Sequence, residues 1–134
     1  MSGERDYSHR TRIEKLGVKA GTRVAVIGID DGPFAAELAQ VVPTLAGPRA
    51  SGLDLVFLGA DSLAQLDVLV ALAKRIRPEG AIWVVSRKGK AAGIRDTDVI
   101  AGAKRAGLVD NKVVGFSETH TTLRLCIPVA LRKR

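Results

Sequence analysis

The sequence predicts a single three-layer α/β domain, in which a mixed sheet of about five strands lies between two layers of helices. Apolar runs typical of buried parallel strands occur at "TRVAVIGI", "LDLVFLGA" and "AIWVVS". Segments with helical periodicity and capping residues alternate with these runs. Two further runs, "NKVVGFSET" and "TTLRLCIPVA", are joined only by a tight connection near His120, so we expect them to form an antiparallel pair.

The first half of the chain contains two predicted helices. The first is expected over Arg10 to Leu16, with Gly17 as its C-terminal stop. The second is expected from Pro33 to Val41, because a proline in the first turn costs no needed hydrogen bond. The following segment, 42–52, carries two prolines and two glycines and is predicted to be a loop.

A long helix is predicted after the second strand. Asp61 or Ser62 would cap it, and Ser62 with Gln65 matches a capping box. The helix would end at "RPEG", before the third strand. Its apolar face would carry Leu63, Leu66, Leu69, Val70, Ala73 and Ile76.

Asp96 or Thr97 is expected to cap the last helix, which would stop at Gly107 and bury Val99, Ile100, Ala103 and Ala106. Right-handed crossovers leave few topologies for the strands, named A to E in chain order. The expected order is A-B-C-E-D, with strand E antiparallel between C and D. The buried residues of the sheet are expected to include Ala25, Ile27, Leu55, Phe57, Ile82, Val84, Val114 and Leu125.

Length and composition fit one domain with one core. The chain has 134 residues, 46% of them hydrophobic. We expect a disordered N-terminus over residues 1–8, the α/β domain over 9–131 and a basic tail over 132–134. Cys126 is the only cysteine, so no internal disulfide can form, and we expect a core thiol rather than a nucleophile.

We expect no targeting signal in this chain. Its first ten residues, "MSGERDYSHR", have no apolar region of the kind a signal peptide needs. No apolar run approaches the roughly 18 residues of a membrane span. We therefore expect a cytoplasmic protein without a membrane partner.

The net charge of +7 favours an anionic partner, such as nucleic acid, an acidic protein or a phosphate. Ordinary solubility charge explains the excess equally well. Aromatic residues make up only 4% of the chain, too few for a stacking platform if most lie in the core. Recognition of single-stranded nucleic acid is therefore the weaker hypothesis.

Two motifs carry a resemblance to class I methyltransferases: "LGVKAGTRVAVIG" before the first turn and "LAKRIRPEGAIWVV" leading into the third strand. This resemblance implies a Rossmann-like, methyltransferase-type fold. Over residues 8–131 the chain is also similar to a family of short bacterial proteins, the domain-of-unknown-function family 3052. That second resemblance implies a fold and no particular activity.

The glycine-rich loop departs from the methyltransferase pattern. Its acidic position is Val26, and its glycine positions hold Gly28, Asp30 and Gly32. Asp30 places a negative charge where the carboxylate of S-adenosylmethionine would lie, and two charges ~4 Å apart repel by ~4 kcal/mol at a dielectric near 20. The segment 41–53 holds no Asp or Glu for the ribose. We expect no bound S-adenosylmethionine and no other cofactor.

Ligands of open α/β sheets gather at the carboxyl ends of the parallel strands. Such an edge mixes carboxylates, cations and an imidazole here, which could support acid–base chemistry or hold a divalent ion, although we assign no catalytic residue and no metal ligand. Helix capping is the alternative role for the aspartates, and Glu118 and His120 are alternatively turn residues. The candidates are Asp30, Asp31, Asp61, Ser86, Arg87, Lys88, Glu118 and His120.

The loop "SRKGK", Ser86 to Lys90, follows a buried strand and carries the predicted anion-binding residues Arg87, Lys88 and Lys90. Glycines at positions 89 and 93 are expected to make the loop mobile. A solvated, solubilising loop is the alternative.

Three classes of function remain open. The leading hypothesis is a non-catalytic methyltransferase-like module that binds or regulates a partner, either an acidic protein or an anionic small molecule. The second is a small enzyme or ligand-binding domain that uses the carboxylate and Arg87/Lys88 edge for an anionic or metal-bound small molecule. The third is a nucleic-acid binder. The free edge of strand A also allows a homodimer.

Overall fold

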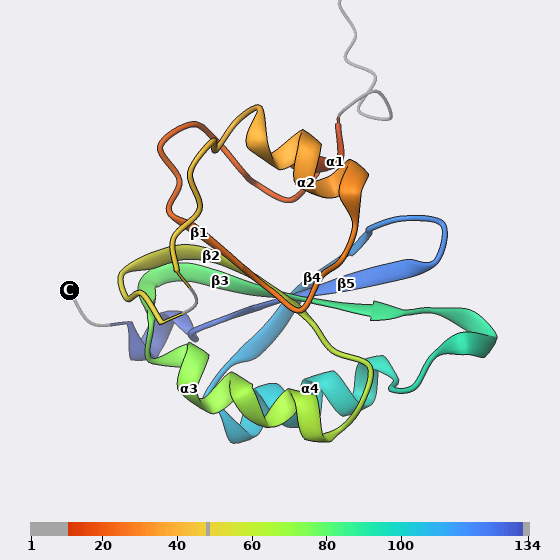
Figure 1. Cartoon of the computed structure of the whole chain (residues 1–134). Coiled ribbons are helices and arrows are strands. Elements are labelled where there is room, and N and C mark those ends of the chain that lie inside the picture. Colours follow the sequence, from red (N-terminus) through yellow and green to blue (C-terminus); the bar gives the residue numbers. More distant parts are fainter. Residues whose placement is uncertain (1–10, 48, 133–134) are drawn as a thin grey trace, which may run out of the picture.

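A computed structural model describes residues 11–47 and 49–132. A five-stranded sheet separates two helical layers, with α1 and α2 on one face and α3 and α4 on the other (Figure 1). The predicted three-layer α/β class is therefore confirmed. The N-terminus 1–8, Arg10 and the last two residues of the basic tail lie outside the described residues.

The five strands are β1 (Val24–Ile27), β2 (Leu53–Gly59), β3 (Ile76–Arg87), β4 (Val109–Gly115) and β5 (His120–Cys126). Their order in the sheet is β1-β2-β3-β5-β4. The first three strands are parallel, and β5 runs antiparallel to both of its neighbours. This arrangement confirms the predicted order A-B-C-E-D. One sheet edge is partly covered, because the Ala46 N–H donates to the Val24 carbonyl at 2.7 Å.

The helices of the first layer are shorter than predicted. Helix α1 spans Arg12–Lys15 and closes before Gly17, whose φ of +78° stops the helix. Helix α2 spans Gly32–Ala39 and ends two residues before the predicted Val41. Its start is fixed by Asp31, whose carboxylate accepts the Phe34 N–H at 2.9 Å.

The predicted long helix after β2 is wrong. The segment forms the 3-10 helix η2 (Ala64–Val68) followed by α3 (Leu69–Ala73), and Ile76 already belongs to β3. The buried leucines are Leu66 in η2 and Leu69 and Leu72 in α3. Leu63 and Val70 are 59% and 46% exposed instead.

The predicted start of this segment is nearly correct. The Ser62 hydroxyl accepts the Gln65 N–H at 3.2 Å, as a capping box requires. The Gln65 side chain accepts the N–H of Asp61, one residue earlier than the motif predicts, at 2.6 Å. The box therefore holds the turn together without starting a long α-helix.

Helix α4 spans Asp96–Arg105, and its N-cap is Arg95, whose N–H donates to the Asp98 carboxylate at 2.8 Å. The predicted cap at Asp96 or Thr97 is therefore wrong, because both residues already lie inside the helix. Gly107 follows its end with a φ of +78°. Val99 and Ala103 are buried, as predicted, and Ile100 and Ala106 are partly buried. Within the described ranges no helix has both the length and the apolarity needed to cross a membrane.

Each face of the sheet has its own core. Towards α3 and α4 the core contains Leu58, Ile82, Val84, Leu123 and Leu125. Towards α1 and α2 it contains Phe34, Phe57, Trp83 and Phe116, and the Trp83 indole donates to the Leu16 carbonyl at the end of α1 at 3.1 Å.

The predicted burial holds for six of the eight sheet residues. Ala25, Leu55, Phe57, Ile82, Val84 and Leu125 are buried, and so is Cys126. Ile27 and Val114 are only partly buried, contrary to the prediction, because β1 and β4 are the two edge strands.

Arg12 ties the first layer together. Its guanidinium donates to both carboxylate oxygens of Glu37, at 3.0 and 2.7 Å, and to the Phe116 carbonyl at 2.7 Å. It also lies 4.8 Å from the centre of the Phe116 ring and 5.4 Å from that of Phe34. One side chain, 16% exposed, thus joins α1, α2 and the turn between β4 and β5.

Arg12→Ala should lower the free energy of unfolding by about 2 kcal/mol, because several charge-assisted hydrogen bonds and two ring contacts are lost together. Urea denaturation would measure the change. Arg77→Ala is the control, because Arg77 pairs with Asp54 at 3.0 Å while 53% exposed, and such a pair contributes about 0.5 kcal/mol. Equal losses in the two variants would contradict the central role of Arg12.

Candidate functional site

The structure divides the candidate residues between two cavities at the carboxyl edge of the sheet. Asp30, Asp31 and His120 line a cavity of about 180 Å³, here called the glycine-loop cavity, together with Gly28 and Gly59. A larger cavity of about 560 Å³, here called the β3-loop cavity, is lined by Ser86, Arg87, Lys88, Arg95 and Thr121, among others. Asp61 and Glu118 line neither cavity.

Gly28 and Gly59 bring the ends of β1 and β2 into backbone contact. Gly28 has a φ of +71°, which L-residues with side chains rarely adopt. A Cβ at Gly28 would lie 3.3 Å from the Gly59 carbonyl oxygen, and a Cβ at Gly59 would overlap the Gly28 carbonyl. The glycines of this loop therefore allow one strand end to pack against its neighbour.

The two aspartates of this loop have different surroundings. Asp31 caps α2 and lies 3.9 Å from the Arg12 guanidinium, so the capping role anticipated for it is present. Asp30 is exposed and is not the capping residue. The glycine-loop cavity therefore has two carboxylates in its wall, and no Lys or Arg among its described lining residues.

Glu118 and His120 belong to the turn between β4 and β5. The Ser117 hydroxyl accepts the N–H groups of Thr119 and His120, at 3.3 and 3.1 Å, which fixes the turn. The His120 ring shares a 2.7 Å hydrogen bond with the Thr119 hydroxyl and reaches the glycine-loop cavity. Glu118 is exposed, in agreement with the alternative that it is a turn residue.

Asp61 connects two loops. Its carboxylate accepts the Arg87 N–H at 2.8 Å, so it is neither a helix cap nor part of a cavity wall. Its carbonyl oxygen packs so closely against Gly93 that a Cβ there would overlap it. Gly93 thus allows the two loops to pack closely, and the expected mobility of the loop stays a prediction.

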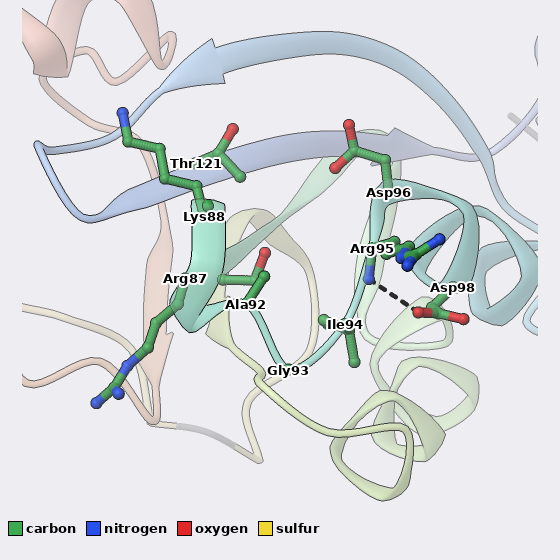
Figure 2. Close-up of a pocket in the computed structure, with 11 residues that line it drawn as sticks. Arg87, Lys88, Ala92, Gly93, Ile94, Arg95, Asp96, Asp98 and Thr121 are labelled. Atoms are coloured by element: carbon green, nitrogen blue, oxygen red, sulfur yellow. Dashed lines mark hydrogen bonds between the residues drawn. The ribbon is translucent and has the colours of Figure 1, made fainter.

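The β3-loop cavity combines a polar floor with opposite charges. Ser86 is only 5% exposed, and its hydroxyl has no hydrogen-bond partner among the described residues. Three cations line the cavity together with Asp96 and Asp98. Figure 2 shows the Arg87 and Lys88 side chains extending in different directions from the end of β3, so the two cations do not converge on one point.

Sequence reasoning missed Thr121 and Asp98 as cavity residues. Thr121 pairs with Ser86 in the register of β3 and β5, which only the strand alignment reveals. Lys90, predicted to bind anions, is exposed in the short helix η3 (Gly89–Ala91) and is not part of the lining. Within residues 11–47 and 49–132, His, Cys, Asp and Glu side chains form no group of three that could hold a metal ion.

Comparisons with known proteins report on the fold. A putative methyltransferase from Thermoplasma acidophilum superposes with a TM-score of 0.64 at 9% identity, covering 89% of this chain and 74% of that one. A SAM-dependent methyltransferase from Aquifex aeolicus superposes with a TM-score of 0.63 at 13% sequence identity, and the match covers 87% of both chains. The pyocyanin biosynthetic protein PhzM superposes with a TM-score of 0.65 at 14% sequence identity, and the match covers 87% of this chain and 53% of PhzM.

These likenesses establish the Rossmann-like, methyltransferase-type fold predicted from the sequence. The chain spans about half of the length of PhzM and of the mitomycin 7-O-methyltransferase MmcR. No family model and no curated protein matches the chain. The similarity to the domain-of-unknown-function family 3052 therefore stays a prediction.

Gly59→Ala should lower the free energy of unfolding by about 2–3 kcal/mol, because the new methyl group would push the ends of β1 and β2 apart. Thermal or urea denaturation of the purified variant would measure the loss. Gly115→Ala is the matched control, since a Cβ at that strand glycine meets no atom within 4 Å. An unchanged stability of Gly59→Ala would mean that the strand ends do not touch.

Proposed function

We propose that the chain is a methyltransferase-like binding or regulatory domain that does not use S-adenosylmethionine. The observation that carries this proposal is the close backbone contact between Gly28 and Gly59, beside which the cavity at the glycine-rich loop measures only about 180 Å³. The fold supplies the scaffold, and the function depends on the residues at its edge.

The glycine-loop residues do not fit the cofactor. Their cavity of about 180 Å³ is smaller than the roughly 300 Å³ at which small-molecule pockets begin. Asp30 and Asp31 would repel the carboxylate of the cofactor, and Val26 stands at the acidic position of the motif. Among residues 11–47 and 49–132 β1 is an edge strand, so no described strand beyond it carries a ribose-binding acid. No methyl-transfer step is assigned to these residues.

Isothermal titration of the purified chain with S-adenosylmethionine or S-adenosylhomocysteine should give no binding heat at sub-millimolar ligand. The reason is charge repulsion together with the missing volume. The same ligand solutions, titrated into an active methyltransferase, serve as the positive control. A micromolar dissociation constant would contradict the proposal.

The partner surface is proposed to include the loop after β3. Arg87, Lys88 and Lys90 are all exposed there, and none of them makes a side-chain ion pair with another described residue. Exposed cations on a fixed loop suit an acidic protein surface. The second candidate function, binding of an anionic small molecule in the β3-loop cavity, is favoured by the unpaired hydroxyl of Ser86 in the cavity floor.

The double variant Arg87→Ala, Lys88→Ala should lose capture of an acidic partner from lysate, while stability changes by no more than about 0.5 kcal/mol per surface site. Lys74→Ala with Lys104→Ala removes the same charge from exposed positions outside this loop and should retain the partner. Identical capture by both double variants would exclude this loop. A small anion that raises the melting temperature of the wild type, and not of the loop variant, would favour the second function.

A further inference from the structure

A third cavity, of about 370 Å³, lies away from the carboxyl edge, on the sheet face that carries α1 and α2. We name it the basic cavity; Lys15, Trp83, Asn111, Lys112 and Arg124 line it, over a floor that includes Leu55. Three of these side chains are cations, and the described lining contains no carboxylate. The β3-loop cavity differs, because two aspartates offset its three cations.

A β-bulge directs two neighbouring residues of β4 into this cavity. The pairing with β5 passes from Asp110 opposite Leu125 to Lys112 opposite Arg124, so Asn111 is an extra residue. Adjacent residues of a regular strand face opposite sides of the sheet. The bulge removes that alternation, and both Asn111 and Lys112 line the cavity. Bulges commonly re-aim side chains in this way.

The three cations have no anionic partners. The side chains of Lys15, Lys112 and Arg124 make no hydrogen bond or salt bridge within the described residues, whereas Arg12 and Arg77 are both paired. Arg124 is partly buried beside Trp83, its neighbour in the register of β3 and β5. Leaving a partly buried cation unpaired costs free energy, which an anion in the cavity would offset.

We propose that the basic cavity binds the phosphate group of a small phosphorylated molecule. A phosphate monoester carries a charge of about −1.5 to −2 and three acceptor oxygens, which suits three cations better than a single carboxylate does. The guanidinium fork of Arg124 can donate two parallel hydrogen bonds to such a group. A volume of about 370 Å³ falls within the range of roughly 300–1,000 Å³ typical of small-molecule sites. The proposal is independent of the function proposed above.

Trp83 provides a readout specific to this cavity, since it is the only tryptophan of the chain. Its fluorescence would be followed during titration with inorganic phosphate, pyrophosphate and tripolyphosphate, at constant ionic strength kept with chloride. The expected result is a saturable change whose dissociation constant falls as the charge of the anion rises. The absence of a saturable change with all three anions would overturn the proposal.

Two variants locate the binding. Arg124→Ala and Lys112→Ala should each weaken pyrophosphate binding about tenfold, the effect of losing one charge-assisted hydrogen bond. Arg124→Lys should recover part of the loss. Lys104→Ala, with the same change of charge on the far helical layer, should bind within about twofold of the wild type. If Arg124→Ala does not fold, Lys112→Ala, which changes an exposed side chain, decides the question.

Two outcomes would contradict the proposal. An equal loss of affinity in Lys104→Ala and Lys112→Ala would show that binding follows net charge and not this cavity. The second outcome is displacement of pyrophosphate by a short oligonucleotide or an acidic peptide that binds at least a hundredfold more tightly and also depends on Lys112. That result would show that the cavity binds a macromolecule and not a small phosphorylated molecule.

Discussion

The guanidinium of Arg12 is the interaction on which the arrangement of the first helical layer depends. α1 has four residues and α2 has eight, so neither helix buries enough surface to fix its own position. Arg12 joins them to the Phe116 carbonyl, 104 positions further along the chain. Because Asp31 both caps α2 and faces Arg12, the same contact sets the course of the loop that leaves β1.

The position of that loop accounts for the small volume, about 180 Å³, of the glycine-loop cavity. The backbone of Gly28 packs against that of Gly59, and the loop then leads to Asp31, the N-cap residue of α2. The carboxyl edge of the sheet therefore holds two separate cavities. Asp30 and Asp31 line the glycine-loop cavity, whereas Ser86 and side chains of both charges line the β3-loop cavity. The fold alone does not determine the function, because the function depends on the residues at this edge.

The strand order followed from the sequence because each strand has a distinctive apolar run and connection rules exclude most alternatives. The segment of η2 and α3 did not, because the three-residue spacing of Leu63, Leu66 and Leu69 fits one face of an α-helix as well as of a 3-10 helix. Choosing between the two requires knowledge of what packs against the leucines.

The candidate site was only partly predictable for a similar reason. Topology places Asp30, Ser86 and His120 at one edge, but residue spacing carries no information on which of them share a cavity. Asp61 looked like a cap, and its bond to the Arg87 N–H depends on two loops meeting in space. The cations of the basic cavity come from three separate elements, and a bulge decides the direction of Lys112.

The bulge at Asn111 also affects how the sheet ends. β4 is an edge strand, and its Val109 and Val113 are 42% and 58% exposed, which would invite another chain to add a strand. An extra residue disturbs the regular spacing of the outward N–H and C=O groups, and the charges of Asp110 and Lys112 stand between the two valines. The irregularity therefore protects the protein against sheet extension and aggregation along an apolar edge.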